Sequence, residues 1–196
     1  MIYEFNPGVW IPLGIVVLAL VLFLGWMIKT YNMFVGLRNK VRNSWSQIDI
    51  QLKRRFDLIP NLVEVAKGYA KHESDIFTAF AEARTMYHQS SESNNVELAA
   101  KAESGLNGAI SRLLAVSEQY PELKANSNFQ SLMEELSDTE DKITYSRQFY
   151  NDHVMKINNQ VEMFPSNIVA SMFHFKSESF FEITHEHERE GVKIKF

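Results

Sequence analysis

The apolar residues of the chain form one long uncharged run, followed by several stretches with helical periodicity. The run extends from Val9 to Ile28 and reads VWIPLGIVVLALVLFLGWMI. In a helix that rises about 1.5 Å per residue, this run covers roughly 30 Å, the thickness of a bilayer's hydrocarbon core. Trp10 and Trp26 lie near its two ends, where indole rings favour the headgroup level. The run therefore predicts a transmembrane helix at residues 9–28.

A cleaved signal peptide is the alternative interpretation of this run. Such a peptide carries positive charge before its apolar part and small residues at a cleavage site after it. Here Glu4 precedes the run and KTYNMFV follows it. We therefore expect a retained membrane anchor.

The charges that flank the run predict its orientation. Residues 1–8 contain no Lys or Arg, whereas Lys29, Arg38, Lys40 and Arg42 follow the run. Because positive charge is retained on the cytoplasmic side of a membrane, we expect a short outer N-terminus (residues 1–8) and a cytoplasmic C-terminal domain. The same four basic residues are candidates for contact with anionic lipid, worth about 1 kcal/mol for each that reaches the surface.

Beyond the run, apolar residues recur every three or four positions, as they do on one face of a helix. The first series starts at Phe34, resumes after Pro60 and continues to Tyr87; no helix breaker separates it from the uncharged run. The residues of QSSESNN, 89–95, have turn composition. Further long helices are predicted at about 96–120 and 128–163, with a turn at Pro121 and KANSN between them. The segment PSNIVASMF predicts a short helix with Pro165 at its start.

These elements predict an all-α protein. We expect an N-terminal single transmembrane helix (9–28), then an antiparallel helical bundle of three to four long helices (29–174) and an irregular C-terminal tail (175–196). The near-heptad register of residues 128–163 suits helices that pack at about 20°. The chain has only eight glycines and five prolines, which also favours helices.

Composition excludes several classes of chemistry. The chain has no cysteine, so disulfides, thiolate zinc sites and cysteine nucleophiles are absent. A net charge of −4 gives no indication of a nucleic-acid partner. The glycines form no phosphate-binding loop, and no GxSxG nucleophile motif occurs. We expect no cofactor and no catalytic residue. A metal-dependent enzyme that uses the tail is the remaining alternative, because FFEITHEHERE contains one Glu-x-x-His pair, Glu182 and His185.

Polar residues within the predicted helices are the candidate site. Buried polar groups persist only when they have partners. They therefore either pair across the bundle and set helix register, or line a partner-binding groove. Pro60 predicts a kink, since it cannot donate to the carbonyl of Phe56, and Arg54 or Arg55 could pair with Asp57 there. The candidate cluster is Arg54, Arg55, Asp57, Asn61, Asn151 and Asp152.

Two long segments resemble the LemA family. The first is YNMFVGLRNKVRNSWSQIDIQLKRRFDLIPNLVEVAKGYAKHE, residues 31–73, and the second is FYNDHVMKINNQVEMFPSNIVASMFHFKSESFFE, residues 149–182. The chain departs from the family pattern at His174, where glycine is usual, and at Ile157, where tyrosine is usual. The resemblance implies a bacterial single-pass inner-membrane protein with a cytoplasmic helical bundle, and it brings no catalytic residues. Relatives are associated with envelope stress, membrane remodelling and magnetosomes.

The sequence thus supports a membrane-anchored interaction scaffold, expected to form a homo-oligomer. Exposed tail aromatics, Phe175, Phe180, Phe181 and Phe196, would dock on a neighbour. The alternative is an adaptor for a membrane-associated enzyme such as a protease, with a membrane-protein partner bound near Arg54, Arg55 and Asp57.

Overall fold

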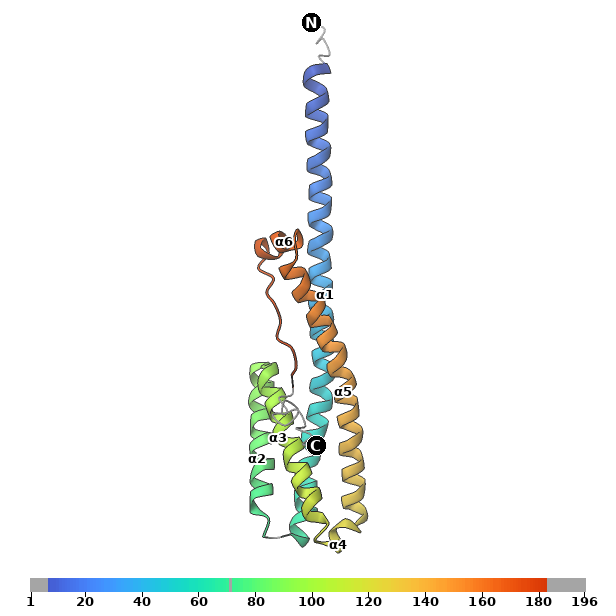
Figure 1. The fold of residues 1–196 in the computed structure, drawn as a ribbon, viewed down its shortest axis with the longest axis vertical. Helices are drawn as coiled ribbons and strands as arrows, with labels where there is room; N and C mark the ends of the chain where they lie inside the picture. The colour runs from blue at the N-terminus through green and yellow to red at the C-terminus, as the bar shows by residue number, and fades with distance from the viewer. Residues whose placement is uncertain (1–6, 71, 183–196) are drawn as a thin grey trace, which may run out of the picture.

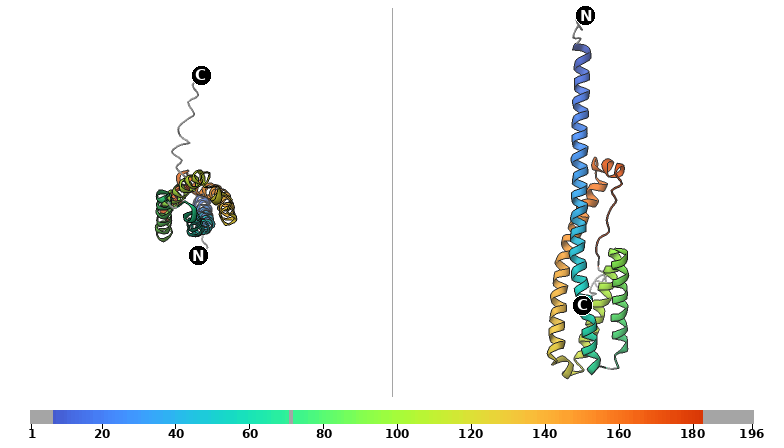
Figure 2. Two further views of the ribbon diagram at one scale, coloured as in Figure 1. Left: turned by 90° about the horizontal axis from the view of Figure 1, so that it is seen from below. Right: turned by 180° about the vertical axis from the view of Figure 1, so that it is seen from behind.

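A single helix runs through most of the length of the molecule. The computed structural model describes residues 7–70 and 72–182, and its first helix, α1, spans Pro7–Tyr69. The large apolar side chains from Trp10 to Leu24 are 42–65% exposed, and this part of α1 stands clear of the other helices (Figures 1 and 2). The lower part of the same helix is a central element of the bundle. The uncharged run and the first bundle helix are therefore continuous.

The other helices pack beside the C-terminal half of α1 (Figure 1). Helices α2 (Ser74–Ser93) and α3 (Val96–Ser117) form a hairpin, the short α4 (Pro121–Lys124) turns the chain, and α5 (Ser127–Glu162) returns antiparallel to α1. At the upper end of α5, α6 (Ser166–Met172) lies against α1. No strand occurs in the described residues. The predicted all-α bundle of three to four long helices is confirmed.

The core is built from the periodic residues of the sequence. Phe34, Ile48 and Leu52 of α1 are fully buried, as are Ile143 and Val154 of α5. The hairpin joins this core through an aromatic pair, because the ring of Phe56 stacks on that of Tyr87 with centroids 4.5 Å apart. Burial of such large side chains against a common face supplies most of the stability of a helical bundle.

Two predicted boundaries were wrong. The first apolar series was expected to continue to Tyr87 as one helix, but α1 ends at Tyr69 and α2 starts at Ser74. Periodicity could not reveal this reversal, because both helices bury one face in the same core. The turn predicted at residues 89–95 is shorter, since the hydroxyls of Ser90 and Ser93 donate to helix carbonyls and α2 continues to Ser93. Asn94, with φ of 49°, then ends the helix.

The end of α6 is a complete Schellman motif. The Phe175 N–H donates to the carbonyl of Ala170 at 2.9 Å, and the His174 N–H donates to that of Ser171 at 3.4 Å. The backbone of His174, the donor of the second of these bonds, has φ of 58°. This left-handed position is the one where glycine is normally found. The substitution of His174 for the usual family glycine therefore falls at a position where the backbone favours glycine.

Candidate functional site

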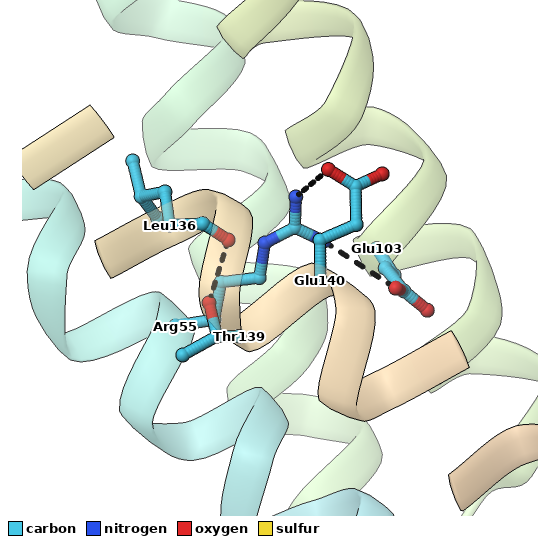
Figure 3. Close-up of polar contacts among 5 residues, drawn as sticks. All are labelled: Arg55, Glu103, Leu136, Thr139 and Glu140. Carbon is cyan, nitrogen blue, oxygen red and sulfur yellow. Dashed lines mark hydrogen bonds and ion pairs between the residues drawn. The ribbon is translucent and has the colours of Figure 1, made fainter. Parts of the chain in front are cut away.

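The lower bundle contains a buried ion cluster centred on Arg55 of α1. Its guanidinium Nη1 lies 3.4 Å from a carboxylate oxygen of Glu103 on α3, and Nη2 lies 3.2 Å from one of Glu140 on α5 (Figure 3). The side chains of Arg55 and Glu103 are 1% and 2% exposed, whereas that of Glu140 is 50% exposed. A single arginine thus links three helices, while Thr139 beside it donates to the carbonyl of Leu136.

Burial dominates the electrostatics of this cluster. Desolvation raises the pKa of Glu103 to about 7, although the positive charges of Arg55 and Arg147 oppose the shift. Desolvation also lowers the pKa of Arg55, against the pull of Glu140 and Glu103. Among the described residues, Glu103 Oε2 and Arg55 Nε are buried without a hydrogen-bond partner. The cluster therefore carries a cost in solvation, as buried ion pairs commonly do.

The geometry of the cluster favours a role in helix register. Removal of one member of a buried pair leaves an uncompensated charge, so a shifted helix would be strongly destabilised. Arg55 lines none of the three clefts described in residues 7–70 and 72–182. The arrangement can select one alignment of α1, α3 and α5.

The other members of the predicted cluster near Pro60 face outward. Arg54 forms an exposed ion pair with Glu135 at 2.6 Å, of the kind that contributes little to stability. Asp57 and Asn61 are exposed, and the ion pairs of both arginines are with glutamates on other helices, so the suggested pairing with Asp57 was wrong. The helix continues past Pro60, and the kink there stays a prediction.

Asn151 and Asp152 do not join the Arg55 cluster. Asn151 follows Glu140 by eleven residues on α5, which places it about 16 Å further along the helix. Asp152 is exposed there. The six candidate residues therefore fall into two groups with different surroundings, and the second group holds the C-terminal segment.

Two asparagines of α5 clamp residues 175–182, which we call the strap. Asn158 accepts a hydrogen bond from the Glu178 N–H at 2.8 Å and donates to the Glu178 carbonyl at 2.9 Å. Asn151 does the same for Phe181, at 2.9 and 3.1 Å. A spacing of seven residues puts both amides on one face of α5. Each amide satisfies both backbone groups of a residue in an extended chain.

Tyr150 adds a third polar contact to the strap. Its hydroxyl donates to the Ser179 carbonyl at 2.9 Å, between the two clamped residues. Burial of the ring, with a smaller effect of the Glu178 charge, raises the pKa of Tyr150 to about 12. The phenol therefore stays protonated, and hence a donor, over the physiological range.

Aromatic side chains fix the two ends of the strap. Phe175 stacks on Phe34 with centroids 4.7 Å apart, and the guanidinium of Arg38 lies 5.3 Å from the centroid of the Phe175 ring. Phe181, 1% exposed, packs near Trp45 at 6.1 Å. The expectation that Phe175 and Phe181 are exposed for docking was therefore wrong, because both rings complete the core. Phe180 is 39% exposed, and Phe196 lies outside the described residues.

Only a weak signal for the clamp is present in the sequence. Asn151 was one of the candidate site residues, and Asn158 was not. Their seven-residue spacing on a helix with a near-heptad apolar series could have marked a polar seam along α5. An irregular segment shows no periodicity, so nothing in residues 175–182 could indicate what they pair with.

The candidate lipid-facing residues differ in their distance from the apolar run. Lys29 is exposed directly at its end. Arg42 follows thirteen residues later, about 20 Å along the helix, and Lys40 and Arg38 lie about 17 and 14 Å away. The headgroup layer is only about 5–8 Å thick on each side, so an upright α1 brings only Lys29 to it. Arg38 contacts the strap instead.

Metal-binding groups are not assembled in the described part of the chain. It contains no group of three or more His, Asp or Glu side chains that could hold an ion. His153 accepts or donates a hydrogen bond with Ser44 at 2.9 Å, and desolvation lowers its pKa. His185 and His187, the tail histidines of the metal hypothesis, lie outside the described residues.

The fold and these contacts define a class of protein: a helical bundle whose central helix extends into a segment long and apolar enough to cross a membrane. The LemA family model matches residues 44–196, and the chain belongs to the LemA family.

Curated relatives agree with this assignment. Magnetosome protein MamQ 2 of Paramagnetospirillum magneticum is 26% identical over 189 residues, covering 85% of this chain and 70% of that protein. Magnetosome protein MamQ of Magnetospirillum gryphiswaldense is 25% identical over 86% of this chain and 71% of its own length. Protein LemA of Metamycoplasma hominis is 26% identical and covers 93% of this chain and 85% of the relative.

Proposed function

We propose that this protein is a membrane-anchored scaffold that assembles with copies of itself and has no catalytic activity of its own. The continuity of α1 is the observation that carries the proposal, because one helix provides both the apolar segment and the centre of the bundle. A continuous helix holds the bundle at a fixed distance from the membrane, whereas a flexible linker would let it move. The names of the relatives connect two of them to the magnetosome, which is consistent with a role in organising membranes.

The proposed location is the bacterial inner membrane, with a short outer N-terminus and a cytoplasmic bundle. The basic residues that follow the apolar run support this orientation through the positive-inside rule. Membrane lipid is the partner of the apolar segment, and no nucleic-acid partner is proposed.

An exposed aromatic pair on α5 is the proposed contact between copies. Tyr145 and Phe149 lie one helical turn apart and are 67% and 61% exposed. Aromatic side chains of this size dominate the energetics of many protein interfaces when they become buried. Their position on α5, away from the apolar segment of α1, would allow contact between anchored neighbours.

Mild detergent extraction followed by native mass measurement tests self-association. We expect an assembly larger than one chain, which the double variant Tyr145→Ser/Phe149→Ser shifts toward monomer. Leu114→Ser is the matched control, since Leu114 is 44% exposed and lies on a different helix, α3. A wild-type protein that stays monomeric at all concentrations contradicts the oligomer.

The adaptor alternative is supported by the exposed polar residues beside Pro60. Arg54, Asp57 and Asn61 present charge and amide groups on the surface of α1, near its C-terminal end and far from the apolar segment. A photocrosslinker at position 57 separates the two functions in cells. Crosslinks between copies support the scaffold, and one dominant foreign partner supports the adaptor.

The metal-dependent alternative is tested by metal analysis of the purified full-length protein. Stoichiometric metal that is lost when residues 182–190 are deleted would revive it. We expect no such stoichiometric metal.

A further inference from the structure

Residues 163–173, which we call the tip, connect α5 to the strap and expose several apolar side chains. They read MFPSNIVASMF and contain no charged side chain. The structure nevertheless leaves much of this segment uncovered: Met163, Phe164, Ile168, Met172 and Phe173 are 57%, 79%, 48%, 55% and 42% exposed. The exposure of Phe164 is the largest among the large apolar side chains of the described residues.

The inner side of the tip is fixed to the protein. Val169 and Ala170 are each 1% exposed and belong to the core cluster. The ring of Phe173 contacts that of Tyr31 on α1 at 4.8 Å, edge to face. The tip therefore has two apolar sides. One side packs on the bundle, and the other exposes large apolar side chains.

The tip lies at the level where the apolar segment of α1 ends (Figure 1). A hollow of about 390 Å³ separates the two, lined by Trp26, Lys29 and Thr30 of α1 and by Phe164 and Pro165 of the tip. Trp26 is partly covered here and packs against the core cluster. Since Ile28 is the last residue of the uncharged run, the tip stands beside the predicted boundary between hydrocarbon and headgroups.

We propose that the tip is a second membrane contact, with its apolar side chains inserted into the interfacial layer of the leaflet that Trp26 faces. The inference rests on the proposed anchoring by α1 and adds a site to it. Interfacial segments bury their apolar face about 5–10 Å into the boundary between headgroups and acyl chains. Lys29, on the wall of the hollow, places a positive charge where a phospholipid carries its phosphate.

Continuity with the apolar segment selects a lipid surface over a second copy of the chain. The tip lies beside the end of that segment, across the hollow that both line, so a bilayer crossed by α1 would reach it without any rearrangement. The exposed pair Tyr145 and Phe149 offers a comparison, because charged Lys142, Arg147 and Asp152 surround it in sequence as expected of a surface in water. The tip has no such charges over eleven residues.

Two membrane contacts have a mechanical consequence. A single transmembrane helix leaves the bundle free to rotate about the helix axis and to tilt. A second contact on one side of α1 restricts both motions, so that the tip side faces the bilayer in every copy. This would present the same bundle surface to each neighbour in an assembly.

Spin labels on the cysteine-free full-length chain, reconstituted in phospholipid nanodiscs, test the proposal. Single cysteines replace Ile168 or Met172 in the tip, Val17 in the apolar segment and Glu92, which is exposed on α2 and outside the proposed contact between copies. The measured quantity is the ratio of collision with oxygen, which partitions into lipid, to collision with a water-soluble nickel chelate. We expect the ratio at both tip positions to lie several-fold above that at position 92 and to approach that at position 17.

The outcomes separate failure of the tip from failure of the anchor. A tip ratio equal to that at position 92, with a high ratio at position 17, overturns the tip contact and leaves the anchor intact. A low ratio at position 17 overturns both. Tip labels shielded from both reagents, with spin–spin broadening that vanishes on dilution by unlabelled protein, would show a contact between copies and would also overturn the proposal. Circular dichroism of each variant confirms that the bundle is folded.

Discussion

His174 shows how one residue can carry a conformational cost that its contacts do not reveal. It is exposed and has φ of 58° at the end of α6, where only glycine avoids the clash of a β-carbon. We expect His174→Gly to stabilise the protein by about 0.5–1 kcal/mol, after allowance for the greater freedom of glycine in the unfolded chain. A rise in the midpoint of thermal unfolding of the full-length protein measures it.

Asn94 supplies the control for this substitution. It has φ of 49°, but asparagine tolerates the left-handed region better than histidine does. Asn94→Gly should therefore raise the midpoint less than His174→Gly. A destabilised His174→Gly variant would contradict the idea of strain at this position.

Glu103 makes the free energy of unfolding fall as the pH rises, whereas a carboxylate in an ion pair usually makes it increase. Its pKa is raised from 4.5 to about 7 by burial, so the folded state holds a proton that the unfolded state releases between these values. The contribution of Glu103 to the free energy of unfolding is therefore highest below pH 4.5 and falls as the pH rises through about 7. A pKa shift of this size corresponds to a change of roughly 3 kcal/mol in the free energy of unfolding between pH values below 4.5 and above 7.

Glu103→Gln tests this sign, because glutamine resembles the protonated acid and does not titrate. We expect the variant to gain stability relative to wild type as the pH rises from 5 to 8, as measured by thermal unfolding midpoints of both proteins at each pH. Comparison of the two proteins cancels the other titrating groups. A difference that stays flat, or that favours wild type increasingly at high pH, would show that the attraction of Arg55 outweighs burial.

At the residue scale, the sequence predicted which residues are unusual but not their partners. Arg55 was singled out for its charge inside an apolar series, and the structure buries it. Its partners Glu103 and Glu140 come from helices 48 and 85 residues away in the chain, so local spacing could not select them over the nearby Asp57. Tertiary packing alone decides which of two adjacent arginines faces inward.

At the element scale, the strap depends on Asn151 and Asn158. Each asparagine makes two hydrogen bonds to the backbone of an extended segment that has no helix of its own. We expect Asn151→Ala/Asn158→Ala to release the strap at residues 178–181, since each lost bond contributes about 1 kcal/mol and leaves backbone groups without partners. Faster amide exchange at residues 178 and 181, measured by mass spectrometry, would show the release.

Asn159→Ala is the matched control for the strap variant. Asn159 lies next to Asn158 and is exposed on another side of α5. Exchange in the strap should not change in this variant, and exchange in α3 should stay slow in both. Unchanged protection of the strap in the double variant would mean that the burial of Phe175 and Phe181 holds it without the clamp.

The helices themselves were largely predictable, because each buries one face and each is long enough to show its period. Helix α5 was expected at about 128–163 and spans Ser127–Glu162. The reversal after Tyr69 and the path of the strap were not predictable. The reversal preserves the apolar period on both sides, and the strap is ordered by hydrogen bonds from another element.

At the scale of the whole molecule, the membrane and the bundle share α1. The apolar segment ends where the tip packs, and the same helix then provides Phe34, Arg55 and the other central residues of the core. The anchor cannot rotate or tilt without moving the bundle, because no linker intervenes. We propose that this helix crosses the inner membrane once and leaves the whole bundle in the cytoplasm.

Labelling of single cysteines in intact cells by a membrane-impermeant maleimide tests this topology. The natural chain has no cysteine, so Asn6→Cys before the apolar segment and Glu92→Cys on the exposed surface of α2 each report one side of the membrane. We predict that position 6 is labelled in intact cells and that position 92 is labelled only after lysis. Labelling of position 92 in intact cells would contradict the topology.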